Sequence, residues 1–265
     1  MTATVVTAGP VTQGRVLRSE WIKLKSVRST VVVTGLTIFC LVGLSLLVSY
    51  LTRARWNQLS PGEQQPWTLL SRSLIGVDLA QLTVGALGVV VITGEYTTGM
   101  IRATLGAVPK RLPVLWAKLA VFTVITFAVV LVSSFAAFLL GQAVLGSHGV
   151  ALSYPGALRA VFGVSMYVTV VGILGVALGF LIRNTAGGVT AVAALVLVLP
   201  EIIRSLPSSW ADNIYPYLPS SAGQAVFAQH SNAVTMGPWS GFALFCGYTA
   251  VAILAAAWAL RRRDA

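Results

Sequence analysis

The sequence predicts an all-α membrane protein that crosses the bilayer several times, and two observations lead to this fold class. Hydrophobic residues make up 56% of the 265-residue chain and charged residues only 9%, with a mean hydropathy of +0.84. A globular domain carries roughly a quarter of charged residues, so a soluble enzyme is excluded, and so is intrinsic disorder. The apolar residues also form blocks of about twenty, the length at which a helix crosses a bilayer.

Six apolar blocks follow one another along the chain, and each predicts one transmembrane helix within a single transmembrane domain over residues 1–265. A helix of about 22 residues is ~33 Å long, which spans the ~30 Å hydrocarbon layer. The blocks lack the two-residue alternation of a membrane β-barrel. The predicted spans cover residues 29–51, 73–93, 115–140, 157–182, 185–203 and 239–260.

Lysine and arginine are divided unevenly between the two sides of the predicted bundle, thirteen against five. By the positive-inside rule the richer side is cytoplasmic, so both termini are predicted in the cytoplasm. The lysines and arginines lie in short clusters between spans, so the net charge of +11 does not indicate a nucleic-acid partner. The cytoplasmic set is Arg15, Arg18, Lys23, Lys25, Arg28, Arg102, Lys110, Arg111, Lys118, Arg183, Arg261, Arg262 and Arg263. The outer set is Arg53, Arg55, Arg72, Arg159 and Arg204.

Residues 14–28 precede the first span and predict an amphipathic helix that lies in the cytoplasmic membrane interface. The alternative is a positively charged flank with no special role. The predicted apolar face consists of Leu17, Trp21, Leu24 and Val27. The basic residues expected at the interface include Lys23, Lys25 and Arg28.

The polar stretch after the second span predicts a short helix at the cytoplasmic surface, bounded by Gly94 and Pro109. Glu95 lies at its expected N-terminus, where the helix dipole favours a negative charge, and Arg102 lies nearer its C-terminal end. Because the two residues are seven positions apart, they share one face of that helix. A capped loop is the alternative, and residue patterns do not separate the two.

Three charged residues lie in the apolar blocks near their outer ends, where a charge is costly and often functional. Asp78 lies about one turn inside the second span, and Glu201 and Arg204 follow Pro200 at the end of the fifth. One interpretation is interfacial ion pairs, Glu201 with Arg204 and Asp78 with an outer-loop arginine. The other is a polar lining at the exit of a substrate path.

The glycines of the fourth block predict close contact between helices rather than a binding site. These residues are Gly163, Gly172, Gly175 and Gly179.

The chain lacks the motifs of several catalytic classes. No G-x-x-x-x-G-K-[ST] phosphate loop occurs, so energy must come from another subunit or from an ion gradient. Cys40 and Cys246 form no metal-binding group, and His148 and His230 are isolated. Ser165 has no acid or base partner at its depth in the membrane, which argues against a protease. The sequence therefore predicts no enzyme activity, no bound cofactor and no metal site.

Several segments resemble ABC-2 type transporter permeases of bacteria. Residues 94–102, Gly-Glu-Tyr-Thr-Thr-Gly-Met-Ile-Arg, resemble the first cytoplasmic loop of that family, and residues 19–28 resemble its amphipathic connecting helix. Residues 179–188, the Leu199-Pro200 exit and residues 217–223 are similar to further recurring features. The likeness extends over nearly the whole chain in the family's order, and it says nothing of the substrate.

The resemblance implies a permease subunit of an exporter in the bacterial cell membrane. Residues 94–102 would belong to a coupling helix that docks on a separate ATPase, which binds ATP and Mg. Two ATPase copies and a second permease subunit, identical or related, would complete the transporter. The implied coupling residues are Glu95, Tyr96, Gly99, Met100 and Arg102.

Two other functions are compatible with a six-helix membrane protein. A secondary transporter would couple protons or ions through Asp78 and Glu201. Such carriers usually place coupling carboxylates near the bilayer midplane on broken helices, which argues against this alternative. A membrane anchor for a partner protein is the third possibility.

Overall fold

The computed structural model describes residues 12–107, 111–229 and 236–262, and within them every regular element is helical. Six helices in this part of the chain are long and apolar enough to cross a membrane, which confirms the predicted number and makes the protein a multi-pass membrane protein. The spans are Arg28–Ala54, Pro66–Thr97, Leu112–His148, Ala157–Ile182, Thr185–Arg204 and Pro238–Arg262.

Most spans are longer than their apolar blocks, because the helices continue into the flanking polar residues. Three spans contain breaks in α-helical geometry. The first consists of α2 (Arg28–Ile38), the π-helical η1 (Phe39–Gly43) and α3 (Leu44–Ala54). The second consists of α4 (Pro66–Arg72) and α5 (Val77–Thr97). The fifth consists of α9 (Thr185–Ala193), the π-helical η4 (Ala194–Val198) and α10 (Leu199–Arg204).

The remaining elements complete the spans and connect them. The third span is α7 (Leu112–Leu145) with η3 (Gly146–His148), the fourth is α8 (Ala157–Ile182) and the sixth is α13 (Pro238–Arg262). The connecting and flanking elements are α1 (Gln13–Ser26), η2 (Trp56–Gln58), α6 (Met100–Ala107), α11 (Ser208–Ile214), η5 (Tyr215–Tyr217) and α12 (Pro219–Gln224).

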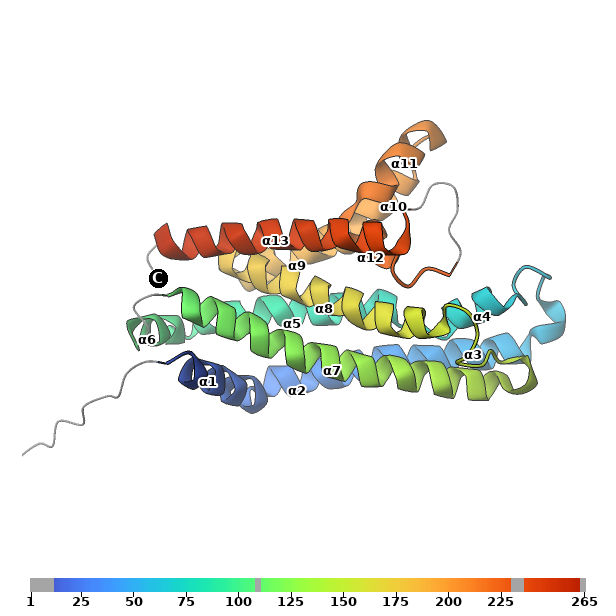
Figure 1. Cartoon of the computed structure of the whole chain (residues 1–265), viewed down its shortest axis with the longest axis horizontal. Coiled ribbons are helices and arrows are strands. Elements are labelled where there is room, and N and C mark those ends of the chain that lie inside the picture. The colour runs from blue at the N-terminus through green and yellow to red at the C-terminus, as the bar shows by residue number, and fades with distance from the viewer. Residues whose placement is uncertain (1–11, 108–110, 230–235, 263–265) are drawn as a thin grey trace, which may run out of the picture.

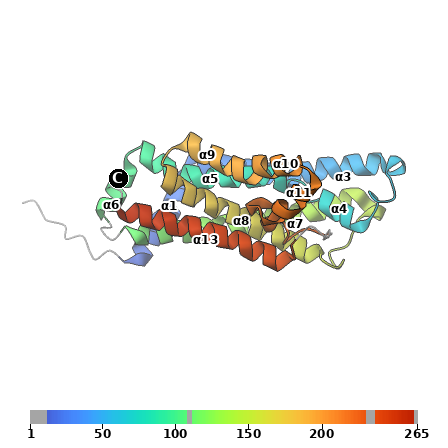
Figure 2. The ribbon, with the colours of Figure 1, turned by 90° about the horizontal axis from the view of Figure 1, so that it is seen from above.

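The spans lie roughly side by side along the long axis of the molecule (Figures 1 and 2). Helices α1 and α6 and the C-terminal end of α13 lie at one end, which we call the basic end. Helices α4, α10, α11 and α12 lie toward the opposite end, where α10 and α11 project away from the bundle. The segment before the first span and the end of the last span therefore share one side, the side predicted to be cytoplasmic.

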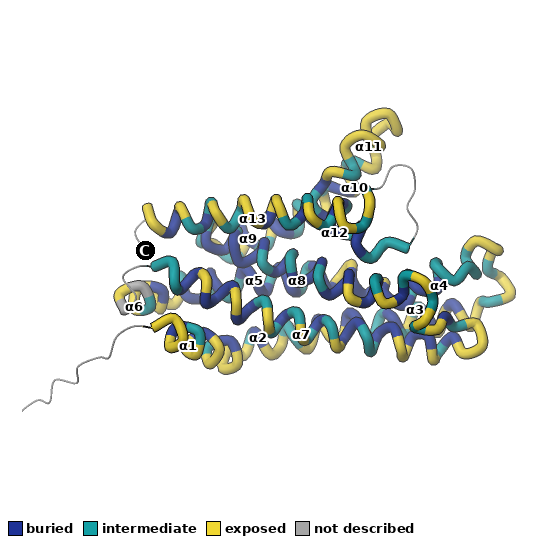
Figure 3. The backbone as a smooth tube through the Cα atoms, in the orientation of Figure 1, coloured by how far each residue is buried: buried dark blue, intermediate teal, exposed yellow. Residues whose placement is uncertain are grey.

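Helix α8 is the centre of the bundle, with 72% of its apolar window buried (Figure 3). Glycines allow α5 to approach it closely, as the glycine pattern of the fourth block predicted. A Cβ added at Gly88 would lie 2.2 Å from the carbonyl oxygen of Gly172, and one at Gly175 would lie 2.2 Å from that of Gly85. Contact between small residues is a common source of helix association in lipid, because no hydrophobic driving force brings helices together there.

The first, fifth and sixth spans bury much less of their surface, 22%, 22% and 28% of their apolar windows. Large apolar side chains such as Phe39, Leu197 and Val251 are therefore exposed on the bundle surface. Such a surface suits contact with lipid or with another membrane subunit.

Replacing Gly88 with alanine should destabilise the bundle by about 1–3 kcal/mol or more, because the new methyl group overlaps the backbone of α8. Thermal unfolding of the purified protein in detergent measures the effect. Gly35→Ala is the matched control, since a Cβ at this exposed position of α2 has no described atom within 4 Å beyond its chain neighbours and the nearby backbone of its own helix. Equal melting temperatures for the two variants would contradict the close contact of α5 with α8.

Candidate functional site

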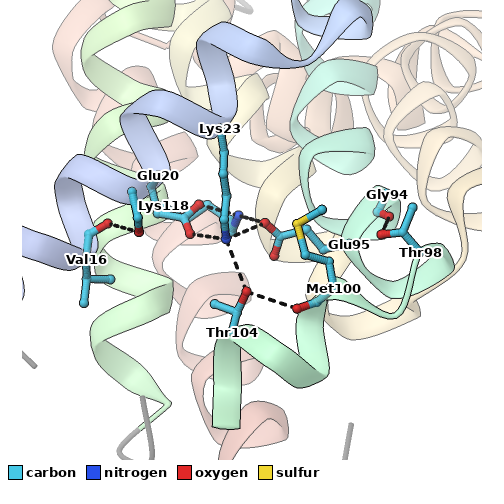
Figure 4. Close-up of polar contacts among 10 residues, drawn as sticks. Val16, Glu20, Lys23, Gly94, Glu95, Thr98, Met100, Thr104 and Lys118 are labelled. Atoms are coloured by element: carbon cyan, nitrogen blue, oxygen red, sulfur yellow. Dashed lines mark hydrogen bonds and ion pairs between the residues drawn. The ribbon is translucent and has the colours of Figure 1, made fainter. Parts of the chain in front are cut away.

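Four helices meet at the basic end around a group of charged side chains (Figure 4). Helix α1 contributes Glu20 and Lys23, the end of α5 contributes Glu95, and α7 contributes Lys118. We call these four residues the ion cluster. Helix α6 joins them through Thr104, so the cluster connects the segment before the first span to the loop between the second and third spans.

Lys118 is the centre of the ion cluster. The residue is 1% exposed, and its Nζ lies 2.6 Å from Oε2 of Glu20 and 2.9 Å from Oε1 of Glu95. Glu20 is equally buried, because Val16, Glu20 and Leu24 form the stripe of α1 that turns inward. A buried ion pair therefore joins α1 to α7, in addition to the exposed hydrogen bond from Gln13 to the carbonyl of Pro113.

Lys23 forms the more accessible half of the ion cluster. Its Nζ donates to Oε1 of Glu20 at 2.8 Å, to Oε1 of Glu95 at 3.1 Å and to Oγ1 of Thr104 at 3.2 Å. The Thr104 hydroxyl in turn donates to the backbone carbonyl of Met100 at 3.1 Å. A single ammonium group thus joins α1, α5 and α6.

The charges of the ion cluster balance, two carboxylates against two ammonium groups. Burial disfavours the charged form of Glu20, but Lys118 and Lys23 outweigh it and hold the pKa of Glu20 below its usual value. Burial acts against charged Lys23 in the same way, and Glu20 and Glu95 nevertheless raise the pKa of Lys23. The contribution of Glu20 to stability is therefore present at neutral pH and is lost as pH falls through its lowered pKa.

A cavity of about 420 Å³ adjoins the ion cluster between α1, α2, α5 and α6. Its wall is mainly apolar and includes Leu24, Val27, Val90 and Val91. Glu95 lines it, and the Oε2 atom of Glu95 is buried without a hydrogen-bond partner in the described chain. Oε2 of Glu95 is therefore the one carboxylate oxygen of the ion cluster that has no hydrogen-bond partner in the described chain.

The predicted short helix, bounded by Gly94 and Pro109, is wrong in its start, and this changes the place of Glu95. Helix α5 continues through Thr97, and α6 begins only at Met100. Gly99 forms the break with φ +69°, and its amide donates to the carbonyl of Tyr96. A left-handed glycine is the common terminator of a helix, whereas a glycine such as Gly94 is tolerated inside one. Glu95 and Arg102 therefore lie on different helices and do not share a face.

The other residues of this segment divide into exposed and internal ones. Met100 is 47% exposed, and Arg102 is exposed as well. Tyr96 lies half-buried against the core, with the guanidinium carbon of Arg183 5.1 Å from its ring centroid. Of the residues predicted to contact a partner, Met100 and Arg102 are thus available on the surface, while Glu95 and Tyr96 contact this chain.

The predicted apolar face of the first helix also changes. Leu24 is buried within the protein, whereas Trp21 and Val27 are exposed on the surface, because the buried stripe runs through Val16, Glu20 and Leu24. Lys25 lies over the Trp21 ring, with its Nζ 5.2 Å from the centroid, and Arg28 is exposed at the start of the first span. An exposed tryptophan beside lysine is typical of a helix at a membrane interface.

Sequence reasoning missed Glu20 and counted Lys118 only toward topology. Lys118 carried a usable signal, since a lone charge one turn inside an apolar block is a functional candidate by the argument applied to Asp78. The signal for Glu20 was weaker: it lies three residues before Lys23, a spacing at which two side chains on a helix are neighbours.

At the opposite end, Glu201 and Arg204 form an exposed ion pair at 2.9 Å. Asp78 has no lysine or arginine within ion-pair distance among the described residues, so the expected pair with an outer-loop arginine does not form there. All three residues line a cavity of about 330 Å³ together with Gln81, Tyr215 and Ser220.

Comparison with models of known protein families and with curated proteins finds no match for this chain. The fold and its six apolar spans therefore define it as a multi-pass membrane protein, and its activity is a matter for proposal.

Replacing Lys118 with methionine should destabilise the protein by about 3–5 kcal/mol, because two buried carboxylates lose their shared cation. The matched control is Lys25→Met, which removes an exposed lysine of α1 and should change stability little. Thermal unfolding in detergent measures both.

A second substitution separates the ion cluster from general damage to the core. Adding Glu20→Gln to Lys118→Met removes one uncompensated charge, so the double variant should unfold at a higher temperature than Lys118→Met alone. Additive losses would show that the pair contributes no coupling energy.

Proposed function

We propose that the protein is the membrane-spanning permease subunit of an ATP-binding cassette transporter, driven by a separate ATPase subunit. The observation that carries the proposal is the ion cluster, which ties α6 and α1 to the ends of the second and third spans. A force applied to α6 reaches α5 through the turn at Gly99 and through Lys23, and it reaches α7 through the pairing of Glu95 with Lys118.

The exposed surface of α6 suits contact with a partner. Met100 offers an unbranched apolar side chain and Arg102 a positive charge, and both lie beside the exposed Thr97 and Thr98 at the turn formed by Gly99. Such a mixture of an apolar anchor and an arginine is common at protein interfaces. In this proposal Glu95 and Tyr96 act inside the permease and do not contact the ATPase.

The likeness of residues 94–102 to the ABC-2 coupling segment supports the same arrangement. The transporter would contain two ATPase subunits, which bind ATP and Mg, and a second permease subunit, the same chain or a related one. The weakly buried faces of the first, fifth and sixth spans leave surface for that subunit and for lipid. The basic end would face the cytoplasm of a bacterial cell, and the transport direction would be export.

An ion- or proton-coupled secondary transporter is the second candidate, because Asp78 is a carboxylate without an ion-pair partner in the described chain. Its position weakens this candidate. Asp78 lies in the first turn of α5, at the end of that helix away from the basic end, whereas coupling carboxylates of carriers usually lie near the bilayer middle. Transport that needs ATP and persists with a protonophore would exclude the carrier.

Arg102→Ala and Met100→Ala should reduce recovery of a co-expressed phosphate-loop ATPase with the purified permease and lower its substrate-stimulated ATP hydrolysis. Each is expected to cost about 1–2 kcal/mol of binding, or roughly tenfold in affinity. Arg55→Ala is the matched control, an exposed arginine at the opposite end that should leave both measurements unchanged. Full association of both α6 variants would contradict docking through α6.

The orientation has its own test in a variant without Cys40 and Cys246. Cysteine at Ala103, exposed on α6, should react with an impermeant thiol reagent only after the membrane is opened. Cysteine at Ser208, exposed at the opposite end, should react on intact cells. Reaction of Ala103→Cys on intact cells would reverse the predicted topology.

A further inference from the structure

The cavity opposite the basic end is the second polar site of the molecule, and we call it the α10–α12 cavity. It lies between the start of α5, the end of the fifth span, η5 and α12, and its volume is about 330 Å³. Small-molecule sites have volumes of about 300–1,000 Å³, so it can hold a small ligand. The lining residues used below are Asp78, Gln81, Pro200, Glu201, Arg204 and Tyr215, together with Ser220.

The charges that line this cavity do not cancel. Arg204 is the one cation among its described lining residues, and Glu201 neutralises it in an ion pair at 2.9 Å. Arg204 also donates a hydrogen bond to the phenol oxygen of Tyr215, and its guanidinium carbon lies 4.6 Å from the centroid of that ring. Asp78 has no lysine or arginine within ion-pair distance in the described chain, so the lining holds two carboxylates against one cation.

A buried hydroxyl provides the second observation. Ser220 is 1% exposed, lines the cavity and has no hydrogen-bond partner in the described chain. The neighbouring Gln81 is by contrast satisfied, because its amide donates to the backbone of Asp78 and its oxygen accepts from the Tyr167 hydroxyl. Buried polar groups are normally paired, so Ser220 calls for a ligand group or a water.

We infer that the α10–α12 cavity binds a small organic ammonium ion, whose charge pairs with Asp78 and whose N–H groups also reach Ser220. Pro200 and the ring of Tyr215 supply apolar surface for the organic part. No group of three or more His, Cys, Asp or Glu side chains that could hold a metal ion occurs in the described residues. The inference names a substrate class for the proposed function. Transport of the amine rests on that function, whereas binding of the amine does not.

Phenethylammonium is the probe, and equilibrium binding to the purified chain in lipid nanodiscs is the measurement. Asp78→Asn should weaken its binding about tenfold or more, because it removes the unpaired charge. Arg204→Gln should tighten binding, because it removes the one cation among the described lining residues. Ser220→Ala should weaken binding severalfold without loss of thermal stability, because its hydroxyl has no partner to lose.

Two controls test separately whether binding depends on the charge of the ligand and on the position of the carboxylate in this cavity. Phenylethanol, which replaces the ammonium with a neutral hydroxyl, should bind the unaltered protein more weakly and should not respond to Asp78→Asn. Glu63→Gln removes a carboxylate that pairs with Arg72 outside this cavity, and it should leave amine binding unchanged.

Two results would overturn the inference: no saturable amine binding by the unaltered protein, or Asp78→Asn binding within about twofold of it. Neither result involves an ATPase, so the proposed coupling through α6 would stand. Loss of ATPase association in the α6 variants would equally leave the amine site untouched.

Discussion

The pairing of Lys118 with Glu20 and Glu95 is the interaction on which the arrangement of the basic end depends. An ammonium group buried among apolar helices is tolerated only when its partners are held in place, and here they come from two other helices. Apolar side chains of similar volume could fill the same space at comparable stability, but they would tolerate sliding and rotation of α1 on α7. The charges admit one alignment, which fixes α1 and, through Lys23 and Thr104, α6.

Helix α5 joins the two polar sites of the molecule. Asp78 is in its first turn and Glu95 in its last, about 25 Å apart along the axis. Between them the helix is held against α8 by backbone contact at Gly85 and Gly88, where no side chain can yield. A displacement of one end is therefore transmitted to the other as movement of a rigid rod. The proposed coupling at the basic end and the proposed amine site share this one element.

The number of spans was predictable because it follows from composition and block length, properties that need no tertiary information. The start of α6 was not, because Gly94 and Gly99 look alike in sequence and only the second adopts a left-handed conformation. Glu20 escaped prediction for another reason. Its burial depends on Lys118, almost a hundred residues away, and a carboxylate on an amphipathic helix is otherwise expected to face water. The exposure of Trp21 follows from the same pairing.

The π-helical segment η4 has a consequence for the fifth span that concerns register. A π-turn holds one residue more than an α-turn, and each residue of an α-helix corresponds to about 100° of rotation. If Ala194–Val198 rewound as α-helix, everything beyond it would turn by that angle about the helix axis. Pro200, Glu201 and Arg204 would then leave the wall of the α10–α12 cavity together, although no helix had bent. A shift of one residue in the helical register of η4 would therefore change which side chains of the fifth span face the α10–α12 cavity.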